Sequence, residues 1–137
     1  MKTLSLIGAG LVAGLLWAAP AAAEGPPALP AICPSPADNG MGNMDMNMGG
    51  GLDAAHAAME EGMDDMNRLM MSGMTASDID VAFICGMIPH HWGAIVMAKA
   101  ELANGDDPWA RELAQKIITA QEAEIAQMLE WLQKQPQ

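Results

Sequence analysis

The chain has 137 residues and a mass of 14.4 kDa, which leaves room for one small domain and its attachments. Only 4% of the residues are aromatic, and 17 acidic residues against 6 basic ones give a formal net charge of −11. This charge repels phosphate groups, and the scarcity of aromatic rings leaves no platform for stacking bases, so we expect no nucleic-acid partner.

Residues 1–23 have the features of a secretory signal peptide. Lys2 makes the N-terminal region positively charged, an apolar run covers residues 4–18, and three alanines at 21–23 precede Glu24 as a cleavage site. The run is about 15 residues long, whereas a helical membrane span needs roughly 20. We therefore expect cleavage after Ala23, an exported protein that is periplasmic or secreted, and no membrane attachment after cleavage.

Residues 24–51 are predicted to form a flexible, disordered arm rich in Pro, Gly and Met. Five prolines between Pro26 and Pro36 prevent a helix and favour an extended linker. Residues 39–51 are mostly Gly, Asn and Met, without a period that would bury an apolar face. We hypothesise that the thioethers in this stretch capture Cu(I), the alternative being incidental sequence drift; they belong to Met41, Met44, Met46 and Met48.

Residues 52–135 are predicted to form an all-α domain, a small antiparallel helical bundle. Apolar residues recur at spacings of three and four, and no stretch alternates as a strand does. We expect three main helices, at about 52–72, 77–103 and 107–133, with Asp107 and Pro108 starting the last one. Pro89 is expected to kink the second helix. An apolar core of this size is only marginally stable, and a bound metal or a second subunit would stabilise it. A homo-oligomer is therefore one expectation.

Methionine is unusually frequent, with 14 residues, and many of them fall on helical stripes. The stripe of the first predicted helix is more typical of core packing when taken alone, because Met fills irregular gaps; it holds His56, Met59, Met63, Met66 and Met70. The stripe of the second predicted helix holds Phe83, Met87, His90, Ala94 and Met97, and His91 lies on its neighbour. The inner face of the third carries Gln121, Glu124 and Met128.

Mixed imidazole and thioether ligands point to copper. Thioether sulfur is a soft donor that selects chiefly for Cu(I), so we expect copper as the cofactor, with Cu(I) favoured over Cu(II). The sequence has no C-x-x-C pair for zinc, no calcium-binding loop and no pair of Glu-x-x-His motifs for di-iron. The candidate ligands outside the arm are His90, His91, Met87, Met97, Met128, His56, Met59, Met63 and Met66. No phosphate loop or nucleophile elbow occurs, and we expect no enzymatic activity.

Three segments resemble the CopM-type exported copper-binding proteins, which belong to a broad bacterial family long labelled a domain of unknown function. They are FICGMIPHHWGAIVMA at 83–98, Asp107 with Pro108, and QEAEIAQMLEWL at 121–132. The resemblance implies a ferritin-like helical bundle and a periplasmic copper metallochaperone or copper-resistance protein, with a copper exporter or acceptor as its partner. The positions that match the family signature are Met87, His90, His91, Met97 and Met128.

The two cysteines, Cys33 and Cys85, leave two interpretations open. In an exported protein, an even number of cysteines favours a disulfide, which would pin the proline-rich segment to the second helix. The alternative is a thiolate that binds copper.

A different class of function is also open. A helical groove lined by Met suits an interaction or chaperone module with no obligatory metal, because Met surfaces adapt to many shapes. Such a module would bind peptide without metal, which separates it from a copper binder.

Overall fold

The computed structural model describes residues 25–38, 40 and 53–136. These residues form four helices and no strand: α1 (Ala54–Glu60), α2 (Met63–Gly73), α3 (Ile79–Asn104) and α4 (Pro108–Gln133). The prediction of a small all-α bundle is confirmed. The expected signal peptide and the four methionines of the arm, Met41, Met44, Met46 and Met48, lie outside the described residues.

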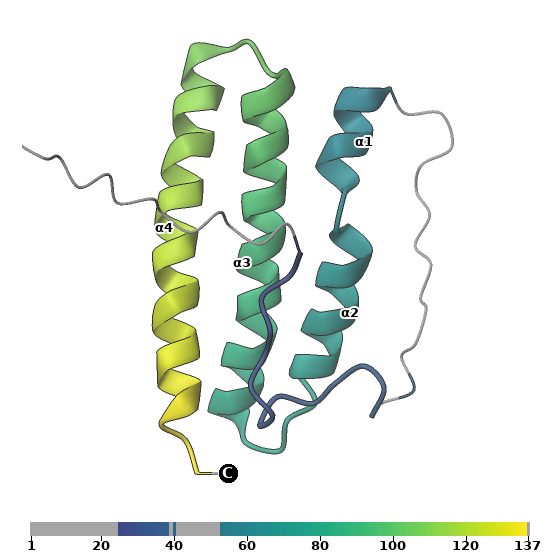
Figure 1. Cartoon of the computed structure of the whole chain (residues 1–137), viewed down its shortest axis with the longest axis vertical. Coiled ribbons are helices and arrows are strands. Elements are labelled where there is room, and N and C mark those ends of the chain that lie inside the picture. The colour runs from purple at the N-terminus through teal and green to yellow at the C-terminus, as the bar shows by residue number, and fades with distance from the viewer. Residues whose placement is uncertain (1–24, 39, 41–52, 137) are drawn as a thin grey trace, which may run out of the picture.

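α3 is the central helix of the bundle (Figure 1). It packs against α4 on one side and against α1 and α2 on the other. Because it has neighbours on both sides, its residues are largely apolar and 11 of its 26 are buried. By length and composition alone α3 could cross a membrane, and its place in the core accounts for that composition.

The ends of α3 and α4 agree closely with the prediction because both begin with an aspartate cap. The carboxylate of Asp78 accepts hydrogen bonds from the backbone N–H groups of Asp80 and Val81. The carboxylate of Asp107 accepts one from Ala110, and Pro108 follows at the first helical position. Pro89 is fully buried, and α3 continues through it without interruption.

The first predicted helix is wrong as a single element, because the structure divides it into α1 and α2. Gly62 between them has φ +77°, a left-handed conformation that glycine adopts without a steric penalty. A β-carbon at Gly62 would also lie 2.5 Å from the indole ring of Trp92 on α3. The break therefore comes from a close approach to α3, and it separates Met59 on α1 from the methionines of α2.

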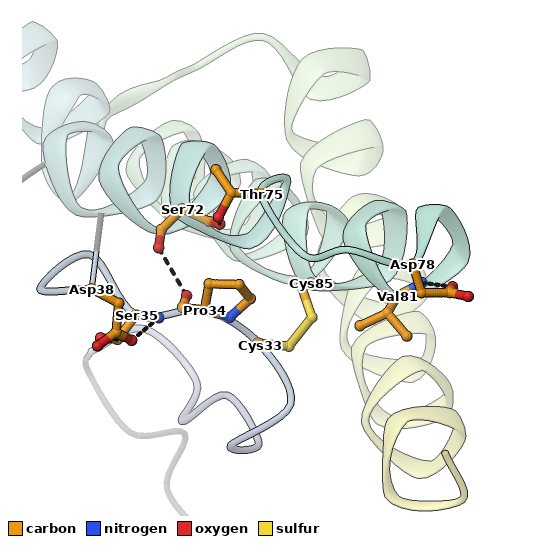
Figure 2. The surroundings of a disulfide bond; sticks show 9 residues. All are labelled: Cys33, Pro34, Ser35, Asp38, Ser72, Thr75, Asp78, Val81 and Cys85. Carbon is orange, nitrogen blue, oxygen red and sulfur yellow. Dashed lines mark hydrogen bonds between the residues drawn. A yellow bond between two sulfur atoms is a disulfide. The ribbon is translucent and has the colours of Figure 1, made fainter. Parts of the chain in front are cut away.

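Residues 25–38, which we call the strap, do not form the free linker that the prolines suggested. Cys33 forms a disulfide with Cys85 of α3, which decides between the two interpretations of the cysteines (Figure 2). Both cysteines are buried, together with Val81, Ile88 and Leu132, in one apolar cluster. Ser72, at the end of α2, donates a 2.8 Å hydrogen bond to the carbonyl oxygen of Pro34. Cys33, with the half-buried Leu29 and Ile32 beside it, thus anchors the strap to the core.

Candidate metal centre

The strap covers one face of α3 and leaves the opposite face open. On a helical projection, Cys85 lies opposite the stripe of Phe83, Met87, His90, Ala94 and Met97, which we call the open face. The flanks of α3 are taken by α2 and α4. In the described part of the chain this stripe is largely exposed: Phe83 is 60% exposed, Met97 is 45% exposed and His90 is exposed, whereas Met87 and Ala94 are half-buried.

His90 is the unpartnered imidazole of the open face. Among the described residues, neither of its ring nitrogens has a hydrogen-bond or ion-pair partner, and its one ring contact is with His91, at a centroid distance of 5.9 Å. Both nitrogens of this ring are therefore available to a ligand.

His91 is placed differently because it points toward α4. Its Nδ1 atom lies 2.9 Å from the carbonyl oxygen of Met87, and its Nε2 atom lies 2.7 Å from a carboxylate oxygen of Glu124. The side chain is only 12% exposed. Both ring nitrogens thus have oxygen partners. His91 therefore links α3 to α4, whereas His90 has no hydrogen-bond or ion-pair partner among the described residues.

Two glycines bring thioethers of α2 close to the turns on either side of His90. A β-carbon at Gly93 would collide with Sδ of Met66, and one at Gly86 would lie 2.9 Å from Cγ and 3.8 Å from Sδ of Met74. Gly86, His90 and Gly93 follow one another at spacings of four and three, so they share one edge of α3. The buried Met66 and the exposed Met74 therefore lie along the seam between α2 and α3, about one turn after and one turn before His90.

Met74 was missed by the sequence analysis because it lies beyond the predicted end of the helix. It forms the C-terminal cap of α2 and is 48% exposed. Met66, Met70 and Met74 follow one another at intervals of four residues. This helical spacing could have identified Met74 as part of the same stripe.

The other predicted ligands are divided among several places. Met87 and Met97 lie on the open face with His90. Met128 is half-buried and packs against the apolar cluster around Cys85, which gives it a packing role. Met63 begins α2 and is half-buried.

His56 and Met59 lie on α1, a different helix from the other methionines of the predicted stripe. His56 is exposed, and its Nδ1 atom lies 2.9 Å from the carboxylate of Asp53. The segment that carries them borders the C-terminal half of α3, where Ala58 lines a cavity with Val96 and Ala103. The predicted methionine stripe is thus divided between α1 and α2.

The polar residues of α4 lie beside His91. The carboxylate of Glu124 lies against Nε2 of His91, and the Glu124 side chain is 55% exposed. One turn earlier on α4, Oε1 of Gln121 is buried and has no hydrogen-bond partner among the described residues. Glu124 can orient His91 but does not contact His90.

No three side chains of the His, Cys, Asp or Glu types come together as a metal site within residues 25–38, 40 and 53–136. A metal ion at the open face would therefore depend on methionine sulfur in addition to imidazole. That donor set suits a soft monovalent ion better than a hard divalent one.

One protein-family model matches residues 17–132, and its description is a domain of unknown function, DUF305. The match covers most of the chain. The protein belongs to the DUF305 family. The DUF305 match includes the strap, α1 to α3, the open face and all but the last residue of α4, and no curated protein matches the chain.

Proposed function

We propose that this DUF305 protein is an exported copper-binding protein, which holds Cu(I) for sequestration or for transfer to another protein. The observation that carries the proposal is the position of His90. It is an exposed imidazole without a described partner, on a turn of α3 flanked by the thioethers of Met66 and Met74. Met87 and Met97 follow on the same open face.

The chemistry of these donors fits Cu(I). Imidazole nitrogen binds copper readily, and neutral thioether sulfur favours its monovalent state. Thioethers bind weakly enough individually to exchange with the ligands of an acceptor protein, which a carrier requires. Binding at His90 breaks no hydrogen bond in the described structure, so the site is available without local unfolding.

The proposal assigns different tasks to the two adjacent histidines. His91 would have to release Glu124 before its Nε2 atom could bind copper. We therefore assign copper binding to His90 and assign to His91 the positioning of α3 against α4.

The compartment and partner are part of the same proposal. A buried disulfide is typical of proteins from an oxidising compartment, which agrees with the signal peptide expected at residues 1–23 and with a periplasmic or secreted protein. The resemblance to CopM-type proteins supports a metallochaperone or a copper-resistance function, with a copper exporter or acceptor as the partner. The chemistry is binding, and we assign no catalytic residue.

The test is an anaerobic competition titration of residues 24–137 with Cu(I) and a chromophoric chelator. We expect His90→Ala to remove one class of copper and His91→Ala to retain it. His56→Ala is the matched control, because it removes an exposed imidazole from α1. If His90→Ala keeps the affinity and stoichiometry of the unmodified protein, the proposed site is wrong.

A second candidate function has one observation in its favour. The open face and the adjoining end of α2 expose large apolar side chains, among them Phe83 at 60% and Met71 at 46%. An exposed apolar patch commonly marks a surface that binds another molecule. If the metal-free protein binds unfolded chains and Phe83→Glu abolishes this, the interaction module is favoured over the copper binder.

A further inference from the structure

We infer that two copies of this chain pair through their open faces, α3 against α3 and antiparallel, and that the two His90 imidazoles share one copper ion at the twofold axis. The inference rests on the proposed function, because it names how the copper site at His90 is completed. It concerns residues of the open face only.

The spacing along the open face is that of a helix-to-helix seam. Its five residues follow at intervals of four, three, four and three, the repeat with which two helices interdigitate over successive turns. In a single chain this seam has no described partner, as the exposure of Phe83 and Met97 shows. Its centre is His90, the third of the five residues.

A twofold axis at His90 makes the seam complementary to itself. In an antiparallel pair, a residue before His90 faces a residue at the same interval after it. Phe83 then faces Met97 of the second copy, a favourable contact between a ring and a sulfur atom. Met87, three residues before His90, faces Gly93 of the second copy, next to Ala94, so a large side chain meets small residues. His90 faces His90.

The charges and the exposed area indicate that the pairing depends on the metal. No carboxylate lies on the open face between Asp80 and Glu101, but each chain carries a net charge of −11, which opposes association. The exposed side chains of Met74, Phe83 and Met97 offer roughly 300 Å² per copy, less than half of the 800 Å² that a standard interface buries on each partner. A cation at the axis offsets the repulsion and supplies the missing attraction.

The site itself also calls for a second copy. One chain presents a single unpartnered imidazole, and the other donors near it are thioethers. A second His90 doubles the number of strong nitrogen donors without moving any described side chain out of a hydrogen bond. The exposed thioether of Met74 from each copy then remains as an exchangeable neighbour.

The inference is tested by anaerobic sedimentation velocity of residues 24–137 with and without Cu(I), together with titration of bound copper. We expect a monomer without copper and a dimer with it, and the copper lost in His90→Ala should amount to one ion per two chains. X-ray absorption should show two imidazole nitrogens per ion of this class. His90→Ala should stay monomeric with copper.

Two charge variants separate the seam from general effects of charge. Phe83→Glu places a carboxylate in the seam and should weaken copper-dependent dimerisation at least tenfold. Trp109→Glu adds the same charge at a position that is 71% exposed on α4, and it should dimerise as the unmodified chain does.

The outcomes distinguish this inference from the proposed function. A copper-loaded monomer with one His90-dependent ion per chain overturns the inference and leaves the proposed function standing, whatever molecule covers the open face. Absence of Cu(I) binding overturns both. A dimer of equal strength without copper or in His90→Ala also overturns the inference, because the pairing would then not need the shared ion.

Discussion

The Nε2 atom of His91 on α3 lies 2.7 Å from a carboxylate oxygen of Glu124 on α4, whereas the adjacent His90 has no such partner in the described structure. Consecutive residues of a helix point about 100° apart, so one histidine faces the neighbouring helix and the other faces the open side. The division of tasks between these two residues can be measured.

We predict that His91→Ala lowers the free energy of unfolding by about 1 to 2 kcal/mol, because the mostly buried imidazole contacts both the carboxylate of Glu124 and the carbonyl oxygen of Met87. Glu124→Ala should produce a smaller loss, and the double variant should lose less than the sum, because both single changes remove the contact between these two residues. Urea unfolding followed by circular dichroism measures this. Full additivity of the two losses would contradict a direct contact. His90→Ala, by contrast, should leave stability unchanged.

The disulfide between Cys33 and Cys85 should contribute strongly to stability. It closes a sequence separation of 52 residues, for which chain entropy gives a stabilisation of about 4 kcal/mol. The double variant Cys33→Ser, Cys85→Ser should therefore melt at a much lower temperature than the oxidised protein. The unmodified protein in a strong reductant should have the same melting temperature as the double variant. Equal melting temperatures with and without the disulfide would show that the strap does not stabilise the bundle.

Glycines at the seam of α2 and α3 should differ in their tolerance of a methyl group. In Gly73→Ala the new carbon would lie 2.6 Å from the backbone carbonyl of Cys85, which cannot move alone, so we expect a loss of about 2 to 3 kcal/mol. In Gly86→Ala the only close contact is with Cγ of the flexible, half-exposed Met74 side chain, at 2.9 Å, and the Met70 carbonyl oxygen lies at an ordinary 3.6 Å, so this change should cost less than half as much. Thermal unfolding of both variants checks the order, and an equal cost would contradict it.

The first turn of α1 should depend on pH through Asp53. Its pKa lies below the ordinary value of 3.8, first because its carboxylate accepts a hydrogen bond from the backbone N–H of His56 and then because it contacts the His56 ring. A lowered carboxylate pKa gives a stabilisation that is complete above pH 3.8 and is lost as the pH falls through the lowered value.

We therefore expect the backbone amide signals of α1 to report fraying of this helix below pH 3.8. Asp53→Asn should remove the pH dependence and keep a cap, whereas Asp53→Ala should fray α1 at every pH. An acid transition that persists in Asp53→Asn would assign the effect to another group.

The sequence by itself determined the helical class and the ends of the two long helices. Apolar spacing and aspartate caps are local signals, and Asp78 and Asp107 act through backbone groups two or three residues away. It also placed Met87, His90 and Met97 on one face, because that relation follows from helical geometry alone.

The tertiary structure decided what depends on contacts between distant segments. The division into α1 and α2 comes from Gly62 meeting Trp92 of α3, and the packing of the strap comes from Cys33 meeting Cys85. The different surroundings of His90 and His91 likewise depend on where α4 lies. Helical periodicity gives the direction of a side chain about its own axis, but only the placement of neighbouring helices determines whether that direction leads to a partner or to solvent.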